Sequence, residues 1–292
     1  GGHHLLLVGP PGCGKTLLAS RLPGLLPPAS EAEALETAAV LSVSGRGLDP
    51  SAWRTRPFRN PHHTASAVAL VGGGAEPRPG EISLAHNGVL FLDELPEWQR
   101  HALEVLREPL ESGVVTISRA ARQSEFPARF QLVAAMNPCP CGWAGDVSSR
   151  CRCSSDVITR YRARISGPLL DRIDLHVDVP RLPPAALRPD APGGEPSADV
   201  AARVASARDR QLARAGTLNA RLDQSATTRD CRLASKDQAL LERAIEALHL
   251  SARSMHRILR VARTIADLDG SEAIATAHLT EALGYRGAGA GC

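Results

Sequence analysis

An eight-residue segment near the start of the chain constrains its fold most. The segment GPPGCGKT, from Gly9 to Thr16, fits the pattern G-x-x-x-x-G-K-[ST]. The apolar run LLLV at 5–8 precedes it as a buried parallel strand would, and a helical pattern follows over 16–26, stopped by two prolines. Between a strand and a helix, such a segment turns its backbone N–H groups toward phosphate oxygens. The pattern therefore predicts a nucleoside triphosphate site. The residues expected to contact ATP are Gly9, Pro10, Pro11, Gly12, Cys13, Gly14, Lys15, Thr16 and Leu17.

Two later apolar runs supply polar residues for the same site. VLFL at 89–92 ends in Asp93 and Glu94, and FQLVAA at 130–135 is followed by Asn137. We expect Thr16 and Asp93 to ligate Mg²⁺, Glu94 to activate the attacking water, and Lys15 and Asn137 to contact the γ-phosphate. Each short motif is common alone, and Asn137 before a proline is more often a turn residue. The combination predicts ATP hydrolysis.

Strands alternating with helices predict an α/β fold with a doubly wound parallel sheet. We expect a helix over 97–111 and a fourth strand at 174–179. A Pro- and Gly-rich linker at 181–197 follows the first domain, 1–180. Helical periodicity over 198–286, with helices near 198–216, 235–248, 251–268 and 271–284, predicts a small all-helical lid domain. The low-complexity tail 287–292 is expected to be disordered.

The composition limits the cellular compartment and the kinds of binding partner that we expect for this chain. No apolar run is long enough for a bilayer span, which argues against a membrane protein. The odd number of cysteines, seven, argues against a disulfide framework and for a reducing, cytoplasmic compartment. The stretch 119–164 holds eight arginines against three acidic residues, a surplus of five, whereas the whole chain has a net charge of +3. This stretch favours a polyanion partner, with a solvated face or inter-subunit salt bridges as the alternative.

Four of the cysteines are clustered: Cys139, Cys141, Cys151 and Cys153. Four thiolates can bind zinc tetrahedrally with no other ligand. The one-residue gaps differ from those of a zinc ribbon, so two disulfides or four free thiols are the alternatives. We expect a structural Zn²⁺ in the loop 139–153, with no catalytic role.

Long matches make the chain similar to the magnesium-chelatase-like AAA+ proteins of the YifB/ComM type. They are GGHHLLLVGPPGCGKT, RPFRNPHHTAS, PGEISLAHNGVLFLDELPE, AAMNPCPCG, SGPLLDRIDLHV and LSARSMHRILRVARTIADL. The resemblance implies a ring-forming ATPase, a homo-oligomer of hexameric size. Full-length members of this group carry an N-terminal domain similar to that of Lon-type proteases. This chain begins instead at the first strand, so we expect it to be a fragment.

The resemblance also assigns two arginines. Arg172, in LLDRID, matches the arginine finger offered to a neighbouring subunit's γ-phosphate, with a local salt bridge to Asp171 or Asp174 as the alternative. Arg253, in LSARS, matches the second sensor arginine, which acts in cis; Arg257 lies one turn later on the same face.

Two insertions mark this group. Residues 64–88 contain Gly72-Gly73-Gly74, which indicates a flexible tip, and 114–129 predict two short strands around a turn near 120–121. In a ring both insertions would face the central channel. There Arg119 and Arg122 are expected to bind DNA phosphates without reading sequence. His62 and His63 are interpreted as framework residues.

The leading hypothesis is a DNA-remodelling ATPase of the branch-migration type. The alternative is a magnesium-chelatase-type chaperone ATPase that remodels a protein partner. A sigma-factor-directed activator is a third class, but the GAFTGA loop of such proteins is missing and VALVGGG stands near its place. A passive nucleotide-binding scaffold conflicts with the presence of Glu94, Asn137 and Arg172.

Overall fold

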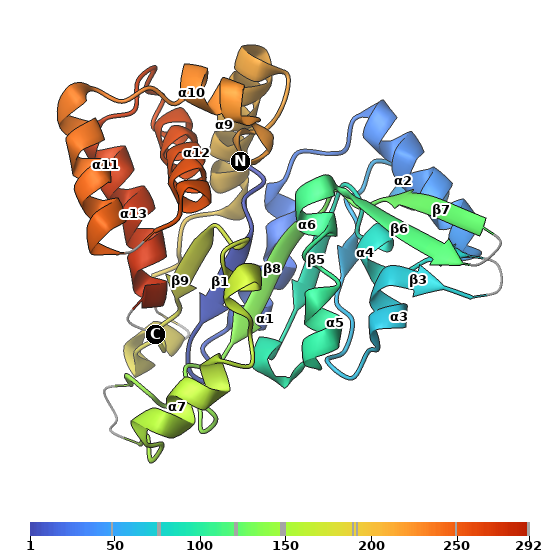
Figure 1. Cartoon of the computed structure of the whole chain (residues 1–292), viewed down its shortest axis with the longest axis horizontal. Helices are drawn as coiled ribbons and strands as arrows, with labels where there is room; N and C mark the ends of the chain where they lie inside the picture. Colours follow the sequence, from blue (N-terminus) through green and yellow to red (C-terminus); the bar gives the residue numbers. More distant parts are fainter. Residues whose placement is uncertain are drawn as a thin grey trace. The chain divides into compact units, whose positions relative to one another are not determined.

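The computed structural model describes residues 1–47, 49–74, 77–119, 122–146, 150–188, 190, 192–248 and 250–290, without the side chains of 119, 122, 187 and 287–290. A five-stranded sheet flanked by helices forms its centre (Figure 1). The spatial order of the strands is β2 (Phe58–Arg59), β5 (Val89–Leu92), β8 (Gln131–Met136), β1 (Leu5–Val8) and β9 (Leu175–Asp178). Pairs β2–β5 and β5–β8 are parallel. The predicted α/β class with a C-terminal helical region is confirmed.

The chain divides into two compact units, which we describe separately. The α/β unit comprises 6–172 and 179–188, and the helical unit comprises 1–5, 173–178 and 189–292. The helices of the α/β unit are α1 (Lys15–Arg21), η1 (Leu22–Leu25), α2 (Glu31–Ser44), η2 (Pro50–Ala52), α3 (Ala67–Val71), α4 (Glu81–Leu84), η3 (Leu95–Glu97), α5 (Arg100–Glu104), α6 (Pro109–Ser112), α7 (Ser155–Arg162), α8 (Gly167–Leu170) and η4 (Pro184–Leu187).

The helical unit is built from amphipathic helices around one apolar core. They are α9 (Ser197–Ala215), η5 (Asn219–Arg221), α10 (Gln224–Asp230), α11 (Ser235–Ala247), α12 (Ala252–Leu268) and α13 (Thr276–Ala290). Helix α12 contributes Ile258, Val261, Ala262 and Ala266 to that core, at a spacing that places them on one helical face. Ser251 caps α12 by accepting a hydrogen bond from the backbone of Ser254.

Central strands of the sheet are buried on both faces. All four residues of β5 are fully buried, as are Leu132 to Ala135 of β8. This explains why both strands read as continuous apolar runs rather than alternating ones. Because parallel strands end at the same edge, the polar residues that follow β1, β5 and β8 are brought together there.

The structure corrects several predicted boundaries, and proline explains two of them. The helix expected over 97–111 is broken into α5 and α6, because Pro109 has no N–H to continue the helical ladder. The helix expected to end at Leu26 instead passes into η1 at Leu22, next to Pro23. The sequence analysis also missed the two-residue strand β2.

The first insertion differs from the expected flexible tip. Strand β3 (Gly72–Gly73) pairs antiparallel with β4 (Arg78–Pro79). Gly72 has φ 102°, and a Cβ atom there would lie 2.1 Å from the carbonyl oxygen of Arg78, so the glycines permit close strand pairing. In the second insertion the two predicted strands, β6 (Val114–Arg119) and β7 (Arg122–Pro127), pair antiparallel, and the turn predicted near 120–121 lies outside the described residues.

The end of the chain also departs from expectation. Helix α13 continues to Ala290, so residues 287–290 of the tail expected to be disordered are helical. Helix α13 is anchored in the core through Leu279 and Ala282, and its helical conformation continues over 287–290 although Gly287 and Gly289 disfavour a helix. The final two residues lie outside the described part. The domain boundaries at 180 and 197 remain predictions.

Candidate nucleotide and metal sites

The glycine-rich loop after β1 has the conformation that its sequence predicts. Gly12 and Gly14 have φ of 76° and 92°, which glycine adopts without steric cost. Gly9 donates its N–H to the carbonyl of Met136, which fixes the loop to the end of β8. Helix α1 begins directly at Lys15.

Two of the predicted catalytic residues meet across 122 positions of sequence. The Lys15 ammonium donates to Asn137 Oδ1 at 3.1 Å and to the carbonyls of Gly9 and Pro10 at 2.7 and 2.9 Å. Lys15 is only 8% exposed, so its charge is held in place by these oxygens. The structure thus places Asn137 beside the residue expected to contact the γ-phosphate.

The two predicted magnesium ligands are also in contact. Thr16 Oγ1 donates to Asp93 Oδ2 at 2.7 Å. The other Asp93 oxygen accepts the backbone N–H of Glu94, and the Asp93 carbonyl accepts the Trp98 indole N–H. A hydroxyl and a carboxylate oxygen are ligands that Mg²⁺ accepts together with water and phosphate oxygens. The pair therefore fits a magnesium ion bridged to a bound nucleotide.

Glu94 has an unusual backbone and an unexpected partner. It adopts φ 51°, a left-handed conformation that is uncommon for residues other than glycine. Its Oε2 lies 3.0 Å from Nδ1 of His63. The ring centroids of His63 and His62 are 4.1 Å apart, and the two rings are tilted by 33°. The sequence analysis interpreted His63 as a framework residue and did not foresee that it contacts the candidate base. The RNPHHT segment follows β2, a strand too short for apolar periodicity to reveal.

Arg172 is held within its own α/β unit. Its guanidinium donates to Glu111 Oε2 at 2.6 Å and to the carbonyls of Arg107 and Pro168 at 3.1 and 2.7 Å. A local salt bridge, which the sequence analysis weighed as the alternative to a finger role, therefore exists, and it joins Arg172 to Glu111. To act on a neighbouring subunit, Arg172 must leave Glu111.

Arg253 and Arg257, the two arginines considered for the sensor role, have different surroundings in the helical unit. Arg257 forms an ion pair with Asp174 at 2.8 Å. Burial opposes ionisation of Asp174, but its hydrogen bond with His3 and the charge of Arg257 hold its pKa well below the usual range. Burial also lowers the pKa of His4 to about 4. Arg257 is thus committed to a buried network, whereas Arg253 is exposed in the first turn of α12.

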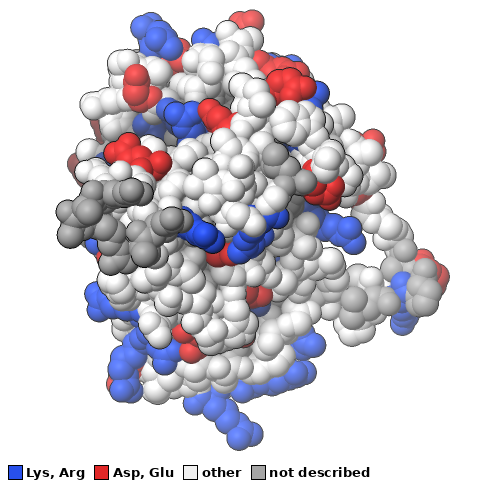
Figure 2. All heavy atoms as spheres, turned by 90° about the vertical axis from the view of Figure 1, so that its right-hand side faces the viewer, with Lys and Arg blue, Asp and Glu red and all other residues white. Residues whose placement is uncertain are grey.

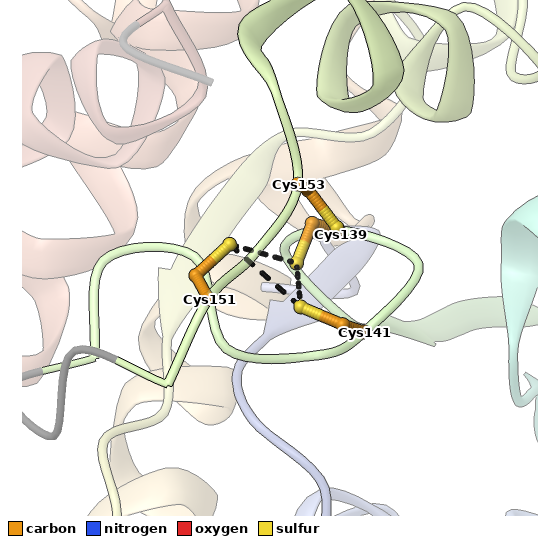
Figure 3. A group of neighbouring side chains, drawn as sticks. All are labelled: Cys139, Cys141, Cys151 and Cys153. Carbon is orange, nitrogen blue, oxygen red and sulfur yellow. Dashed lines mark hydrogen bonds between the residues drawn. The ribbon is translucent and has the colours of Figure 1, made fainter.

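The four cysteines converge as the sequence predicts. Their sulfur atoms all lie within 4.8 Å of one another, drawn from two arms of one loop (Figure 3). The Cys139–Cys151 and Cys141–Cys151 sulfurs are 3.8 and 3.7 Å apart, and the Cys139–Cys141 sulfurs are 3.3 Å apart. A tetrahedral zinc with bonds of about 2.3 Å requires sulfur separations of about 3.8 Å. The donor set therefore fits zinc with minor adjustment.

Hydrogen bonding and charge repulsion among the sulfurs shift the pKa of Cys141 and the pKa of Cys153 in opposite directions. Burial opposes ionisation of Cys141, but hydrogen bonds from Trp143, Cys139 and Arg152 lower its pKa to about 6. A backbone hydrogen bond from Cys141 favours the Cys153 thiolate, yet the sulfurs of Cys141 and Cys139 raise its pKa to about 11. A bound divalent cation would offset this repulsion.

The basic stretch 119–164 is partly engaged inside the chain. Arg162 donates to the Pro138 carbonyl, Arg164 pairs with Glu97 at 2.9 Å, and Arg150 lies over the Trp143 ring. Figure 2 shows basic side chains in several separate groups on the face it draws, with acidic side chains among them. The side chains of Arg119 and Arg122 lie outside the described atoms.

Together, the sheet, the phosphate loop and the Thr16–Asp93 contact define a P-loop NTPase of the AAA+ class. Family comparison is more specific: residues 1–187 match the model of magnesium chelatase subunit ChlI, and 194–286 match that of the ChlI C-terminal region. The chain therefore belongs to the magnesium chelatase ChlI family, whose membership implies an ATPase.

Similarity to individual proteins extends over nearly the whole chain. The chain is 55% identical to competence protein ComM of Haemophilus influenzae and 54% identical to YifB of Escherichia coli, in each case over 98% of its length. It spans only 56% of the length of these relatives. Magnesium-chelatase subunit ChlI of Anabaena variabilis is 28% identical over 41% of this chain and 29% of its own length. The predicted resemblance to the YifB/ComM group is confirmed.

The structure also bears on the expected environment. Within the described residues, no helix combines the length and apolar character that crossing a bilayer requires.

Proposed function

We propose that this chain is the ATP-hydrolysing motor of a homo-oligomeric ring, a hexamer, that remodels branched DNA. One observation carries the hydrolytic part of the proposal: the paired contacts of Thr16 with Asp93 and of Lys15 with Asn137. These contacts assemble the expected groups for phosphate binding, magnesium binding and γ-phosphate sensing at one edge of the sheet. Glu94 would orient the water, Arg253 would act in cis, and Arg172 would act in trans.

DNA as the substrate is supported by the relative named as a competence protein and by the hairpin. In the β6–β7 ladder Arg119 is directly opposite Arg122, next to the turn. Two arginines at the end of a protruding hairpin suit phosphate contacts that do not depend on sequence. The ChlI family match supports a second candidate, an ATPase that remodels a protein partner.

The hairpin distinguishes the two candidates. Replacing both Arg119 and Arg122 with Ala should weaken DNA binding similarly for unrelated sequences and reduce the salt slope of log K by about 1.4 to 1.8, because each lost phosphate contact removes about 0.7 to 0.9. Basal ATPase activity without DNA should survive. Binding measured by fluorescence anisotropy across a salt series tests this.

A matched double variant, Arg100→Ala with Arg243→Ala, removes the same charge from exposed positions outside the hairpin and outside the basic stretch 119–164. It should retain the salt slope of the unmodified protein. An unchanged slope in the folded hairpin variant would favour the protein-remodelling candidate.

We also assign the four-cysteine group to structural zinc rather than to another metal. Four thiolates in a tetrahedral arrangement suit zinc, and no carboxylate or water is needed to complete its coordination. The sulfur separations support this assignment.

A further inference from the structure

The four-cysteine loop lies against the phosphate loop. Cys139 and Cys141 flank a turn closed by a hydrogen bond from the Gly142 N–H to the Cys139 carbonyl, 2.9 Å. A Cβ atom placed on Gly142 would lie 2.6 Å from Cδ and 3.0 Å from Cγ of Pro11. Only a glycine fits at this contact, so the backbone after Cys141 packs directly on the ring of a residue expected to cradle phosphate.

A second connection runs along the chain itself. Asn137, which accepts a hydrogen bond from the Lys15 ammonium, is separated from Cys139 by one residue, Pro138. Cys139 is fully buried, and a Cβ atom placed on Gly142 would lie 3.8 Å from Cγ of Asn137. The sulfur cluster is therefore adjacent to the phosphate loop and to Asn137 at the same time.

The loop that makes these contacts has little structure of its own. Between the end of β8 at Met136 and the start of α7 at Ser155, the described residues contain no helix or strand. Four bonds from Cys139, Cys141, Cys151 and Cys153 to one ion would join its two arms and fix the turn at Gly142. Without the ion, the turn keeps one backbone hydrogen bond, from Gly142 to Cys139, and otherwise depends on weak thiol contacts.

We propose that zinc at the four cysteines positions the phosphate loop, so that zinc binding and nucleotide binding strengthen each other. This inference rests on the proposed zinc assignment and not on the proposed DNA activity. The zinc itself takes no part in hydrolysis. Its effect passes through Gly142 to Pro11 and through Cys139 to Asn137.

Gly142→Ala tests the contact directly. The new methyl group must displace Pro11 and with it the neighbouring backbone of the phosphate loop. Loss of one charge-assisted hydrogen bond from that backbone to phosphate, worth about 1.5–3 kcal/mol, corresponds to about 10- to 150-fold weaker ADP binding. The protein should still carry about one zinc per chain, because all four thiols remain. Zinc is measured by metal analysis of reductively purified protein, and ADP binding by titration calorimetry.

Gly145→Ala is the matched control. Gly145 lies in the same loop and has a similar left-handed φ, 76°, against 82° for Gly142. A Cβ atom on Gly145 would meet no heavy atom of the described residues within 4 Å. Backbone strain is therefore the same in both variants, but only Gly142→Ala presses on the phosphate loop, so Gly145→Ala should bind ADP normally.

Reciprocity gives a second readout in the unmodified protein. If zinc tightens ADP binding about tenfold, then MgADP must tighten zinc binding by the same factor. Extraction of zinc by a chromogenic chelator should then need about ten times more chelator when MgADP is saturating. Lys15→Ala controls for direct chelation of zinc by ADP, and it should show no such shift.

The outcomes bear separately on the zinc assignment and on the coupling between zinc and nucleotide binding. Normal ADP affinity in Gly142→Ala, or an equal loss in Gly145→Ala, would overturn the coupling while leaving the zinc assignment intact. If Gly142→Ala loses its zinc, the coupling is judged from the unmodified protein alone. There, a chelator requirement that MgADP does not change overturns the coupling. A zinc content near zero in the unmodified protein, with four titratable thiols, refutes both the metal assignment and the coupling.

Discussion

Lys15→Ala is expected to eliminate measurable nucleotide binding, whereas Glu94→Gln should bind ATP normally and fail to turn it over. In the proposed function, Lys15 supplies charge-assisted contacts to two phosphates. At about 1.5–3 kcal/mol each, their loss lowers affinity by about 10² to 10⁴. Glu94 touches no phosphate in this scheme and orients water, so its amide variant should lose about 10²- to 10⁴-fold in the hydrolysis rate.

The two variants are compared by equilibrium binding of a fluorescent ATP analogue and by single-turnover hydrolysis. Both substitutions lie at the same sheet edge, so each controls for general damage caused by the other. An equal loss of ATP affinity in both variants would contradict the division of roles. A normal hydrolysis rate in Glu94→Gln would remove Glu94 from the catalytic step.

Arg172→Ala is expected to lower hydrolysis in the assembled ring by about 10³ to 10⁵ while leaving nucleotide affinity nearly intact, because a finger acts on the transition state. Mixing Arg172→Ala subunits with Lys15→Ala subunits tests whether Arg172 acts on the neighbouring subunit. Arg172→Ala subunits keep an intact phosphate loop, and Lys15→Ala subunits keep an intact finger. Mixed rings should therefore recover activity at interfaces where an intact phosphate loop meets an intact finger.

The ion pair in the structure supplies a sharper control. Glu111→Gln removes the charge that holds Arg172 in its own chain, at 2.6 Å. If Arg172 is a finger, this variant should keep or raise the hydrolysis rate. If Arg172 is only a structural partner of Glu111, both substitutions should lower the melting temperature together, and mixing should restore nothing.

The nucleotide site was predictable from sequence because its motifs follow buried strands. Apolar runs placed Asp93 and Asn137 at strand ends, and parallel pairing of β5 with β8 then brings them to one edge. Thr16 and Asp93 meet there although they are 77 positions apart in the sequence. The physical reason is that a central strand must be apolar on both faces, which makes it conspicuous.

Contacts made by irregular segments could not be predicted in the same way. His63 reaches Glu94 from a loop after the two-residue β2, and Arg172 reaches Glu111 across a helix that Pro109 interrupts. Neither segment has a periodicity that defines its course. The packing of Gly142 on Pro11 likewise depends on a positive φ that the sequence permits but does not specify.

The central claim, that ATP hydrolysis here serves DNA remodelling, is tested most directly by the ATPase rate of the purified protein with and without DNA. Single-stranded and four-way-junction DNA are supplied in parallel, and Lys15→Ala gives the background. The account predicts strong stimulation of hydrolysis by DNA, with the junction at least as effective as the single strand. A measurable basal rate that neither DNA changes would contradict it and would favour remodelling of a protein partner.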